Sequence, residues 1–315
     1  MFSIVSCLPL LATEISLHGD AVIKFATVAE ATQHLSQKDR FIQATSPFDR
    51  DSRLKKSGVT QQQLVDYAAA QALAWDEVET AKLTQVMQRL KSKFNRYAIP
   101  FPKTVLLIKT TGKEEGDAAY CRGNAIILPK SKVAGDNLGK LERLMTHELF
   151  HILSSHNSSL RSELYKIIGF TTCNTIQLPQ TLKHRKITNP DAPRFDCVIE
   201  LEIDGKPVNA TPVLFASVEK YDPKSAKTFF QYLTFKLMVV EQTTKGWVAL
   251  LTENRPQMLD PKNVASYFDQ IGRNTGYIIH PDEILADNFV HMVQGSESLA
   301  TPGIVEKMNI VFEKP

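Results

Sequence analysis

The chain carries the pentapeptide His147-Glu148-Leu149-Phe150-His151, in which two histidines stand four positions apart and a glutamate follows the first. Positions i and i+4 share one face of an α-helix, so both imidazoles can bind one zinc ion. Glu148 then lies one step round the helix, where its carboxylate can take a proton from water beside the metal. With 8 histidines in 315 residues, chance would give such a pattern on the order of 0.01 times. The motif therefore predicts a zinc site.

The residues around this motif predict that it lies on a helix. Apolar residues recur at steps of three and four positions from Leu138 to Ile152, which is the spacing of one helical face. Asp136 and Asn137 can cap the start of that helix. The alternative is an amphipathic helix that carries two histidines by coincidence. The helical context and the low chance frequency together favour the zinc site.

Two histidines leave a catalytic zinc in need of one more protein ligand, because such a site takes three from protein and keeps one position for water. Three downstream residues are candidates: His156, Glu163 and Glu283. His156 follows the motif at one residue less than the metzincin spacing and without the glycine that turns the chain there. Glu163 has Ile167, rather than an acid, four positions later. We therefore rank both below Glu283.

Glu283 lies in a segment that predicts a second helix. Pro281 suits the first helical position, and Glu283 and Asp287 share a face because they stand four positions apart. In this combination the chain resembles the gluzincins, the thermolysin-like zinc metallopeptidases, in which a Glu from a later helix joins H-E-x-x-H. The resemblance implies that His147, His151 and Glu283 bind one Zn²⁺ per chain and that Asp287 hydrogen-bonds one of the imidazoles. The alternative for Glu283 is an acid that complements the helix dipole.

The resemblance covers the two motif helices and the strand before the first of them. About 130 residues separate His151 from Glu283, far more than in thermolysin itself, so residues 176–265 would be an insertion. We expect an α+β, zincin-like fold with a mixed sheet, an active-site helix, a second helix that carries the third ligand, and a β-rich insertion. The expected parts are an N-terminal strand and extension (1–60), an N-terminal lobe (61–160), a linking helix (161–175), the insertion (176–265) and a C-terminal lobe (266–315).

Local patterns predict the elements of this fold. Helices are expected at 60–75, 76–97 and 161–170, with Val78 among the inward-facing residues of the second. Strands are expected at 21–26, 104–111, 124–129 and 247–251, and a hairpin at 197–218 turns at Asp204 and Gly205. Residues 229–242 are too apolar for their period to decide between strand and helix. The segment through 46–50 is expected to be polar.

The strand at 124–129 has two interpretations. In zinc peptidases the strand before the metal helix is commonly the sheet edge, where an extended substrate adds through main-chain hydrogen bonds. A plain core strand explains the same residues equally well. Pro129 at its end fits an edge without requiring one.

The expected reaction is hydrolysis of a peptide bond in a peptide or protein substrate, with Glu148 as the base. The developing oxyanion needs a further donor, and Tyr277, His280 and Tyr165 are candidates because they lie near the motif helices in sequence. Arg161 is a weaker one. Two rivals remain: a non-catalytic binding protein on a peptidase-like scaffold, and a zinc hydrolase of other substrates. The intact motif argues against the first.

Composition sets the remaining expectations. A net charge of +3 with both signs interspersed gives no reason to expect nucleic acid as a partner. No stretch reaches the length of a membrane-spanning helix, and the four scattered cysteines indicate no disulfide framework. The apolar run 2–12 is either a signal segment or a buried first strand. Because no Lys or Arg precedes it, we favour a cytoplasmic location over export.

Overall fold

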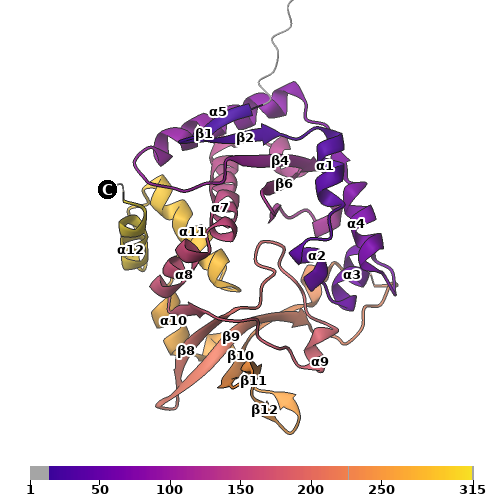
Figure 1. Ribbon diagram of the computed structural model, residues 1–315, viewed down its shortest axis with the longest axis vertical. Helices are drawn as coiled ribbons and strands as arrows, with labels where there is room; N and C mark the ends of the chain where they lie inside the picture. The colour runs from indigo at the N-terminus through magenta and orange to yellow at the C-terminus, as the bar shows by residue number, and fades with distance from the viewer. Residues whose placement is uncertain (1–13, 226, 314–315) are drawn as a thin grey trace, which may run out of the picture.

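Two six-stranded sheets, with helices packed on and between them, form most of the fold (Figure 1). The computed structural model describes residues 14–225 and 227–313, and the run 2–12 lies outside the described residues. One hydrophobic cluster extends from the first sheet through the central helices to the second sheet. The fold is α+β with a mixed first sheet, as predicted.

The first sheet has the strand order β1-β2-β4-β6-β5, with β3 paired to β4. The strands β2, β4 and β6 run parallel, whereas β1, β3 and β5 pair antiparallel with their neighbours. Three of the predicted strands are confirmed, namely those at 21–26, 104–111 and 124–129. The strands are β1 (Glu14–His18), β2 (Ala21–Phe25), β3 (Ala72–Leu73), β4 (Thr104–Thr110), β5 (Tyr120–Arg122) and β6 (Ala125–Pro129).

The strand β6 is not the edge of this sheet. It lies between β4 and β5, and all of its residues are buried. The edge is β5, which folds back on β6 through a turn where Gly123 has a φ of 56°, a conformation that favours glycine. A strand of three residues is too short for its periodicity to stand out in the sequence. Of the two interpretations of the strand at 124–129, the plain core strand is the one that the structure shows. The edge position beside it belongs to β5.

Two helices between β2 and β4 match the predicted ones at their starts. Thr60 caps α4 (Gln61–Ala69), and Asp76 caps α5 (Glu77–Phe94), each in a reciprocal capping box. The first helix ends earlier than predicted, because the chain turns after it to form β3. Val78 was wrongly placed on the inward face, since 72% of its surface is exposed in the first turn of α5.

The segment before α4 holds three short helices that the sequence interpretation missed, including one that begins within the polar residues 46–50. Each begins at a side-chain cap, supplied by Thr27, Asp39 and Ser46 in turn. Their few turns leave little periodicity to detect. The helices are α1 (Val28–Leu35), α2 (Arg40–Ala44) and α3 (Pro47–Leu54).

The two predicted motif helices are α7 (Leu138–His156) and α11 (Pro281–Gln294), and they pack side by side. Asn137 caps α7 as predicted, and Pro281 occupies the start of α11. The rings of Phe150 and Phe289 meet between them at a centroid distance of 5.5 Å. Around them lie α6 (Lys130–Ala134), α8 (Ser158–Ile167), α10 (Ala265–Ile271) and α12 (Pro302–Phe312).

The second sheet is wholly antiparallel, with the order β11-β10-β9-β8-β7 and β14 on β10. Its central hairpin turns at Asp204 (φ 51°) and Gly205 (φ 74°), as predicted. The undecided segment 229–242 is a short 3₁₀ turn (Phe229–Tyr232) followed by a strand. The strands are β7 (Phe170–Thr172), β8 (Cys197–Ile203), β9 (Lys206–Ala216), β10 (Leu233–Thr243), β11 (Gly246–Ala249) and β14 (Met258–Leu259).

The remaining short elements border this sheet and the first. A small hairpin joins β12 (Leu251–Thr252) to β13 (Arg255–Pro256), and α9 (Gln180–Lys183) precedes β8. Two 3₁₀ turns cover Lys113–Glu115 and Pro261–Asn263. Figure 1 shows the loop from α9 to β8 rising from the second sheet toward the first.

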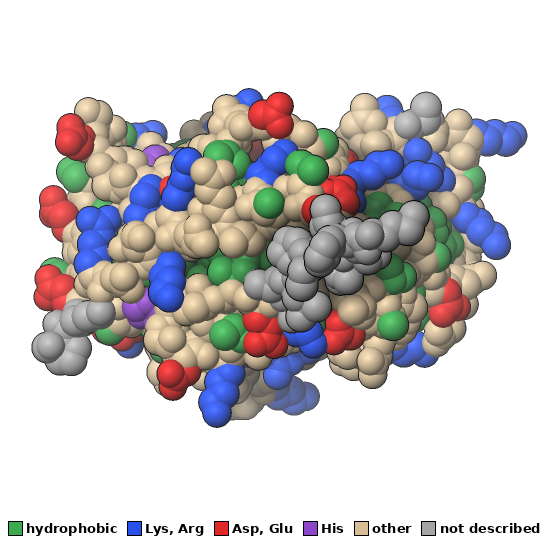
Figure 2. Space-filling view, turned by 90° about the horizontal axis from the view of Figure 1, so that it is seen from above, with side chains coloured by type: hydrophobic (Ala, Val, Ile, Leu, Met, Phe, Trp, Pro, Cys, Tyr) green, Lys and Arg blue, Asp and Glu red, His purple; other side chains and the backbone are tan. Residues whose placement is uncertain are grey.

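The surface mixes both signs of charge. Figure 2 shows Lys and Arg side chains lying among Asp and Glu over one face of the molecule. In the described ranges, no helix is both long enough and apolar enough to cross a bilayer.

Candidate metal centre

The packing of α7 against α11 brings His147, His151 and Glu283 together. The Nε2 atoms of the two histidines lie 3.1 Å apart. Glu283 Oε2 lies 3.1 Å from Nε2 of His147 and 3.4 Å from Nε2 of His151. Glu283 and His147 are 136 positions apart in the sequence. One carboxylate oxygen and two imidazole nitrogens thus face one another at nearly equal distances.

These distances come close to the separations between three ligand atoms of a tetrahedral zinc site. Ligands at about 2.0–2.2 Å in tetrahedral geometry stand roughly 3.3–3.5 Å from one another, and the observed separations are 3.1, 3.1 and 3.4 Å. Two imidazoles and a carboxylate are also a donor set that suits zinc. His156 and Glu163 do not join this cluster. The Nδ1 atom of His156 contacts the Ile152 carbonyl, and Glu163 is exposed on α8.

Asp287 holds the first histidine in place. Its Oδ1 lies 3.2 Å from His147 Nδ1, and its Oδ2 accepts a 2.5 Å hydrogen bond from Thr275 Oγ1. Arg143 Nη2 approaches the same carboxylate at 3.4 Å. A carboxylate that accepts from Nδ1 fixes the ring orientation and leaves Nε2 to bind a metal. The structure thus places Asp287 where the resemblance implied.

The charges of the cluster are complementary. Burial would lower the pKa of His147, but hydrogen bonds with Asp287 and Glu283 raise it well above its usual range. Burial opposes ionisation of His151 as well, yet the Glu283 carboxylate raises the pKa of this imidazole to about 9. Although burial favours the neutral acid at Glu283, the two imidazoles hold its pKa well below the ordinary value. A bound cation would replace the protons of the imidazoles, so metal binding and protonation compete here.

Glu148 lies on the other side of the cluster, next to the edge strand β5. Cys121 Sγ lies 3.3 Å from both the main-chain carbonyl and the carboxylate Oε2 of Glu148. Burial raises the pKa of Glu148, and the positive charges of His147 and His151 act against that rise. Asp191 approaches the same place, because its Oδ1 accepts a 2.6 Å hydrogen bond from Cys121 N–H. Cys121, Glu148 and Asp191 form a second group of potential ligand atoms within 4.8 Å of one another.

The loop between α9 and β8 contributes two residues, Asn189 and Asp191, that contact the site. The sequence interpretation did not identify either residue. Asn189 Nδ2 donates a 2.5 Å hydrogen bond to Glu283 Oε1, and Asp191 bonds to β5 as described above. Both residues lie in a stretch without regular secondary structure. Neither periodicity nor a spaced motif marks them. Only the position of the folded loop shows that they belong to the site.

Tyr277 and His280 differ in their placement. The Tyr277 ring stacks on His147 at a centroid distance of 6.3 Å and an interplanar angle of 24°. Burial and the carboxylate of Glu283 raise the pKa of the Tyr277 hydroxyl above its usual range, which keeps it protonated. His280 instead caps α11, because its Nδ1 accepts from Asp282 N–H, and its ring packs against Tyr165. Tyr165 is buried under Arg161. Of these sequence candidates within the described residues, only Tyr277 places its side chain against a side chain of the cluster, whereas His280 reaches it through its main-chain carbonyl, which accepts from Glu283 N–H.

No protein-family model, curated protein or solved structure matches this chain.

Proposed function

We propose that this protein is a zinc-dependent metallopeptidase of the gluzincin type, with a zincin-like arrangement of α7 and α11 beside the first sheet. The observation that carries the proposal is the spacing of the His147, His151 and Glu283 ligand atoms at nearly tetrahedral separations. A zinc ion held by these residues would act as a Lewis acid toward water and the scissile carbonyl.

Glu148 is the proposed general base. Its carboxylate follows the first histidine on α7 and lies beside the cluster without belonging to the three ligand atoms. Burial and the nearby imidazoles act on its pKa in opposite directions, so its affinity for a proton is set by the site itself. Glu148 would accept a proton from the attacking water and pass it to the leaving amine.

Tyr277 is the proposed donor to the developing oxyanion. Its ring lies against His147, its raised pKa keeps the hydroxyl protonated, and 44% of the residue surface is exposed. His280 is not part of this proposal, because its imidazole is engaged in capping α11.

The test compares the zinc-loaded wild type with Glu148→Gln. The amide keeps the shape of the side chain and cannot accept the proton, so zinc content should stay near one per chain while peptide hydrolysis falls by about 100-fold or more. Digestion of a broad peptide library followed by mass spectrometry measures the activity. Glu163→Gln on exposed α8 is the matched control and should cleave like the wild type.

Two outcomes would count against the proposal. A wild type that binds zinc and cleaves nothing would favour a non-catalytic binding protein. A Glu148→Gln variant that cleaves as well as the wild type would show that another group is the base.

A further inference from the structure

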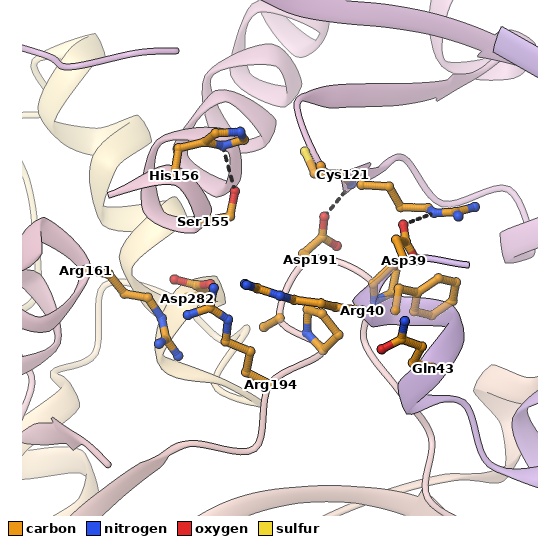
Figure 3. Close-up of a pocket in the computed structure, with 16 residues that line it drawn as sticks. Asp39, Arg40, Gln43, Cys121, Ser155, His156, Arg161, Asp191, Arg194 and Asp282 are labelled. Atoms are coloured by element: carbon orange, nitrogen blue, oxygen red, sulfur yellow. Dashed lines mark hydrogen bonds and ion pairs between the residues drawn. The ribbon is translucent and has the colours of Figure 1, made fainter. Parts of the chain in front are cut away.

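A pocket with a volume of about 540 Å³ adjoins the candidate metal centre. It opens between α2, the edge strand β5, the end of α7 and the loop that carries Asp191 (Figure 3). Cys121 and Asp191 line this pocket and also belong to the group of atoms around Glu148. The pocket therefore lies directly beside Glu148.

Four arginines line the pocket, and two of them are neutralised by the protein itself. Arg122 Nε donates to Asp39 at 2.7 Å, and its other nitrogens bond to main-chain carbonyls. Arg161 binds Asp196 with two nitrogens, at 3.1 and 2.6 Å. Both side chains are buried and fixed.

The other two, Arg40 and Arg194, lack such partners, and we call the space that they border the arginine pocket. Among residues 14–225 and 227–313, no carboxylate lies within ion-pair distance of Arg40, and the one recorded for Arg194 is Asp196 at 4.0 Å. Figure 3 shows Arg40 reaching from α2 and Arg194 from the loop toward the same part of the pocket. Burial and the charges of Arg40 and Arg161 lower the pKa of Arg194, while the carboxylates of Asp196 and Asp282 oppose that shift without reversing it. The guanidinium groups of Arg40 and Arg194 therefore repel each other.

The carboxylates in the wall are already engaged. Asp39 pairs with Arg122, Asp191 accepts from Cys121 N–H, and Asp282 accepts a 2.6 Å hydrogen bond from Ser154 Oγ. None of them bridges Arg40 and Arg194. An incoming carboxylate between these two arginines would relieve their repulsion and receive charge-assisted hydrogen bonds.

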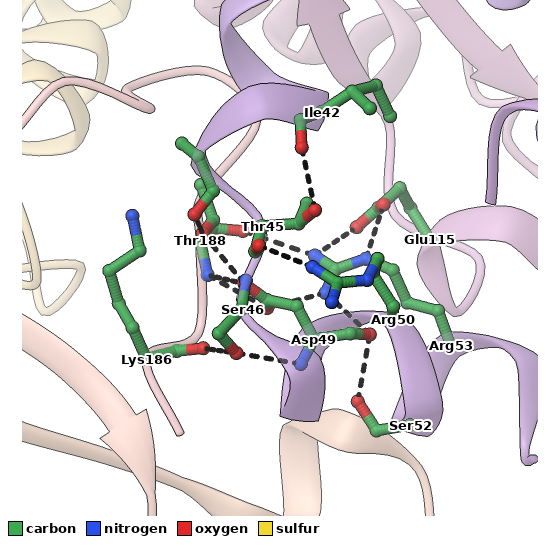
Figure 4. Close-up of polar contacts among 11 residues, drawn as sticks. Ile42, Thr45, Ser46, Asp49, Arg50, Ser52, Arg53, Glu115, Lys186 and Thr188 are labelled. Carbon is green, nitrogen blue, oxygen red and sulfur yellow. Dashed lines mark hydrogen bonds and ion pairs between the residues drawn. The ribbon is translucent and has the colours of Figure 1, made fainter. Parts of the chain in front are cut away.

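The loop that forms one wall is held at both ends, so the arginine pocket is formed in advance. Thr188 Oγ1 donates to Asp49 at 2.7 Å, and Arg53 joins Asp49, Glu115 and the Thr188 carbonyl in one buried network (Figure 4). At the other end, Asp196 is fixed by Arg161. Arg194 lies between these two anchors.

The main chain of the edge strand β5 has few free hydrogen-bonding groups with which to bind a peptide substrate. Two main-chain groups of β5 already have partners, because Cys121 N–H bonds to Asp191 and the Arg122 carbonyl bonds to His34 Nε2. A peptide added along β5 would find few free partners for a main-chain ladder. Selective contacts must then come from pockets beside the strand.

We propose that the arginine pocket binds a carboxylate group of the peptide substrate close to the scissile bond, through Arg40 and Arg194. The carboxylate belongs to an acidic side chain or to the C-terminus of the peptide, and both present the same chemistry to a guanidinium fork. The inference rests on the proposed peptidase function, because it names the substrate class of that site.

The test measures peptide binding by calorimetry to zinc-loaded Glu148→Gln protein, so that hydrolysis does not interfere. Three kinds of probe are compared: an acetylated hexa-alanine amide, the set of peptides in which one Glu replaces each alanine of that amide in turn, and acetylated hexa-alanine with a free C-terminal carboxylate. At least one charged probe should bind about tenfold more tightly than the neutral amide. The charged probe that gains affinity identifies the source of the carboxylate.

Substitutions then assign the gain to the arginine pocket. Arg40→Gln and Arg194→Gln should each remove most of the preference, and Arg194→Lys should keep part of it because the charge remains without the fork. Arg255→Gln on exposed β13 is the control and should keep the full preference. Neither pocket arginine makes a close ion pair in the described structure, so both variants should fold.

The inference is overturned if charged and neutral probes bind equally, or if the preference survives both pocket substitutions. Failure of this inference can be distinguished from failure of the proposed function, because binding is measured without turnover. A preference that depends on Arg40 and Arg194, in a protein whose wild type cleaves no peptide, would support the pocket and contradict the peptidase proposal.

Discussion

Asn189 donates a 2.5 Å hydrogen bond to Glu283 Oε1, although 94 positions separate the two residues in the sequence. This bond occupies one oxygen of the carboxylate and leaves Oε2 facing the imidazoles of His147 and His151. A residue from the loop before the second sheet therefore orients a side chain of α11. Outer partners of this kind position metal ligands.

Asn189→Ala should weaken zinc binding without abolishing it. Loss of the amide frees the Glu283 carboxylate to rotate, and the expected decrease in zinc affinity is about 10–100-fold. Competition with a chelating dye measures the dissociation constant. Asn309→Ala, a change on α12 away from the site, is the control; equal affinities in the two variants would show that Asn189 has no role in orienting Glu283.

His147→Ala or His151→Ala should remove the zinc altogether. Each change leaves an incomplete set of protein ligands, and structural or catalytic zinc sites of this kind need at least three. Native mass spectrometry of the purified variants reads the metal content directly. His156→Ala should retain the ion, since its imidazole contacts the main chain of α7. Zinc retained in full by either motif variant would rule out this centre.

Glu283→Ala should weaken zinc binding more than Asp287→Ala does. The first removes a proposed ligand and should reduce zinc affinity strongly. The second removes the partner of His147 Nδ1, and the expected loss is about 10–100-fold. Titration with zinc under the same buffer conditions compares the two variants. The reverse order, with Asp287→Ala the more damaging, would mean that the two carboxylates have exchanged roles.

Glu114 should make the protein less stable as the pH rises from about 4.5 to about 7. Burial raises the pKa of this carboxyl from 4.5 to about 7, and its Oε2 is buried without a recorded partner. Between these values the folded protein binds more protons than the unfolded chain, so the free energy of unfolding falls as pH increases. The expected decrease from pH 4.5 to 7 is on the order of 2 kcal/mol.

Glu114→Gln removes this titration. Urea unfolding at several pH values should show a flatter dependence of stability in the variant than in the wild type between about pH 4.5 and 7. Glu313→Gln at the exposed end of the chain is the control. Curves that run parallel for wild type and Glu114→Gln would show that Glu114 does not carry this dependence.

The long elements could be predicted from the sequence because several local signals agree at each. Helix α7 has a capping Asn137 at its start, a helical apolar stripe along its length and two histidines four positions apart. In α11, Pro281 at the first turn and the Glu283–Asp287 pair gave both a helix and a candidate third ligand. Where an apolar periodicity, a capping residue and a spaced motif occur together, the local sequence is enough to predict the helix.

The missed features depend on contacts between distant segments. β5 has three residues, and its partner β6 determines its structure. Asn189 and Asp191 lie in a loop whose position follows from the buried contacts of Thr188 with Asp49 and Arg53. Val78 was assigned to the core because apolar character alone does not tell which side of a first turn faces solvent. Such features need the tertiary structure.

Because α7 packs directly on α11, the number of residues between the two motifs can differ from one chain to another. For a flexible connection, loop-closure entropy grows only with the logarithm of length, so each doubling costs about 0.6 kcal/mol. Here the connection holds a sheet with its own hydrophobic cluster, which leaves little of it free. The helix pair therefore sets no fixed spacing between His151 and Glu283. A sequence pattern that specifies both motif helices and allows any number of residues between them would find other chains with this pair of helices. A pattern with a fixed interval would miss them.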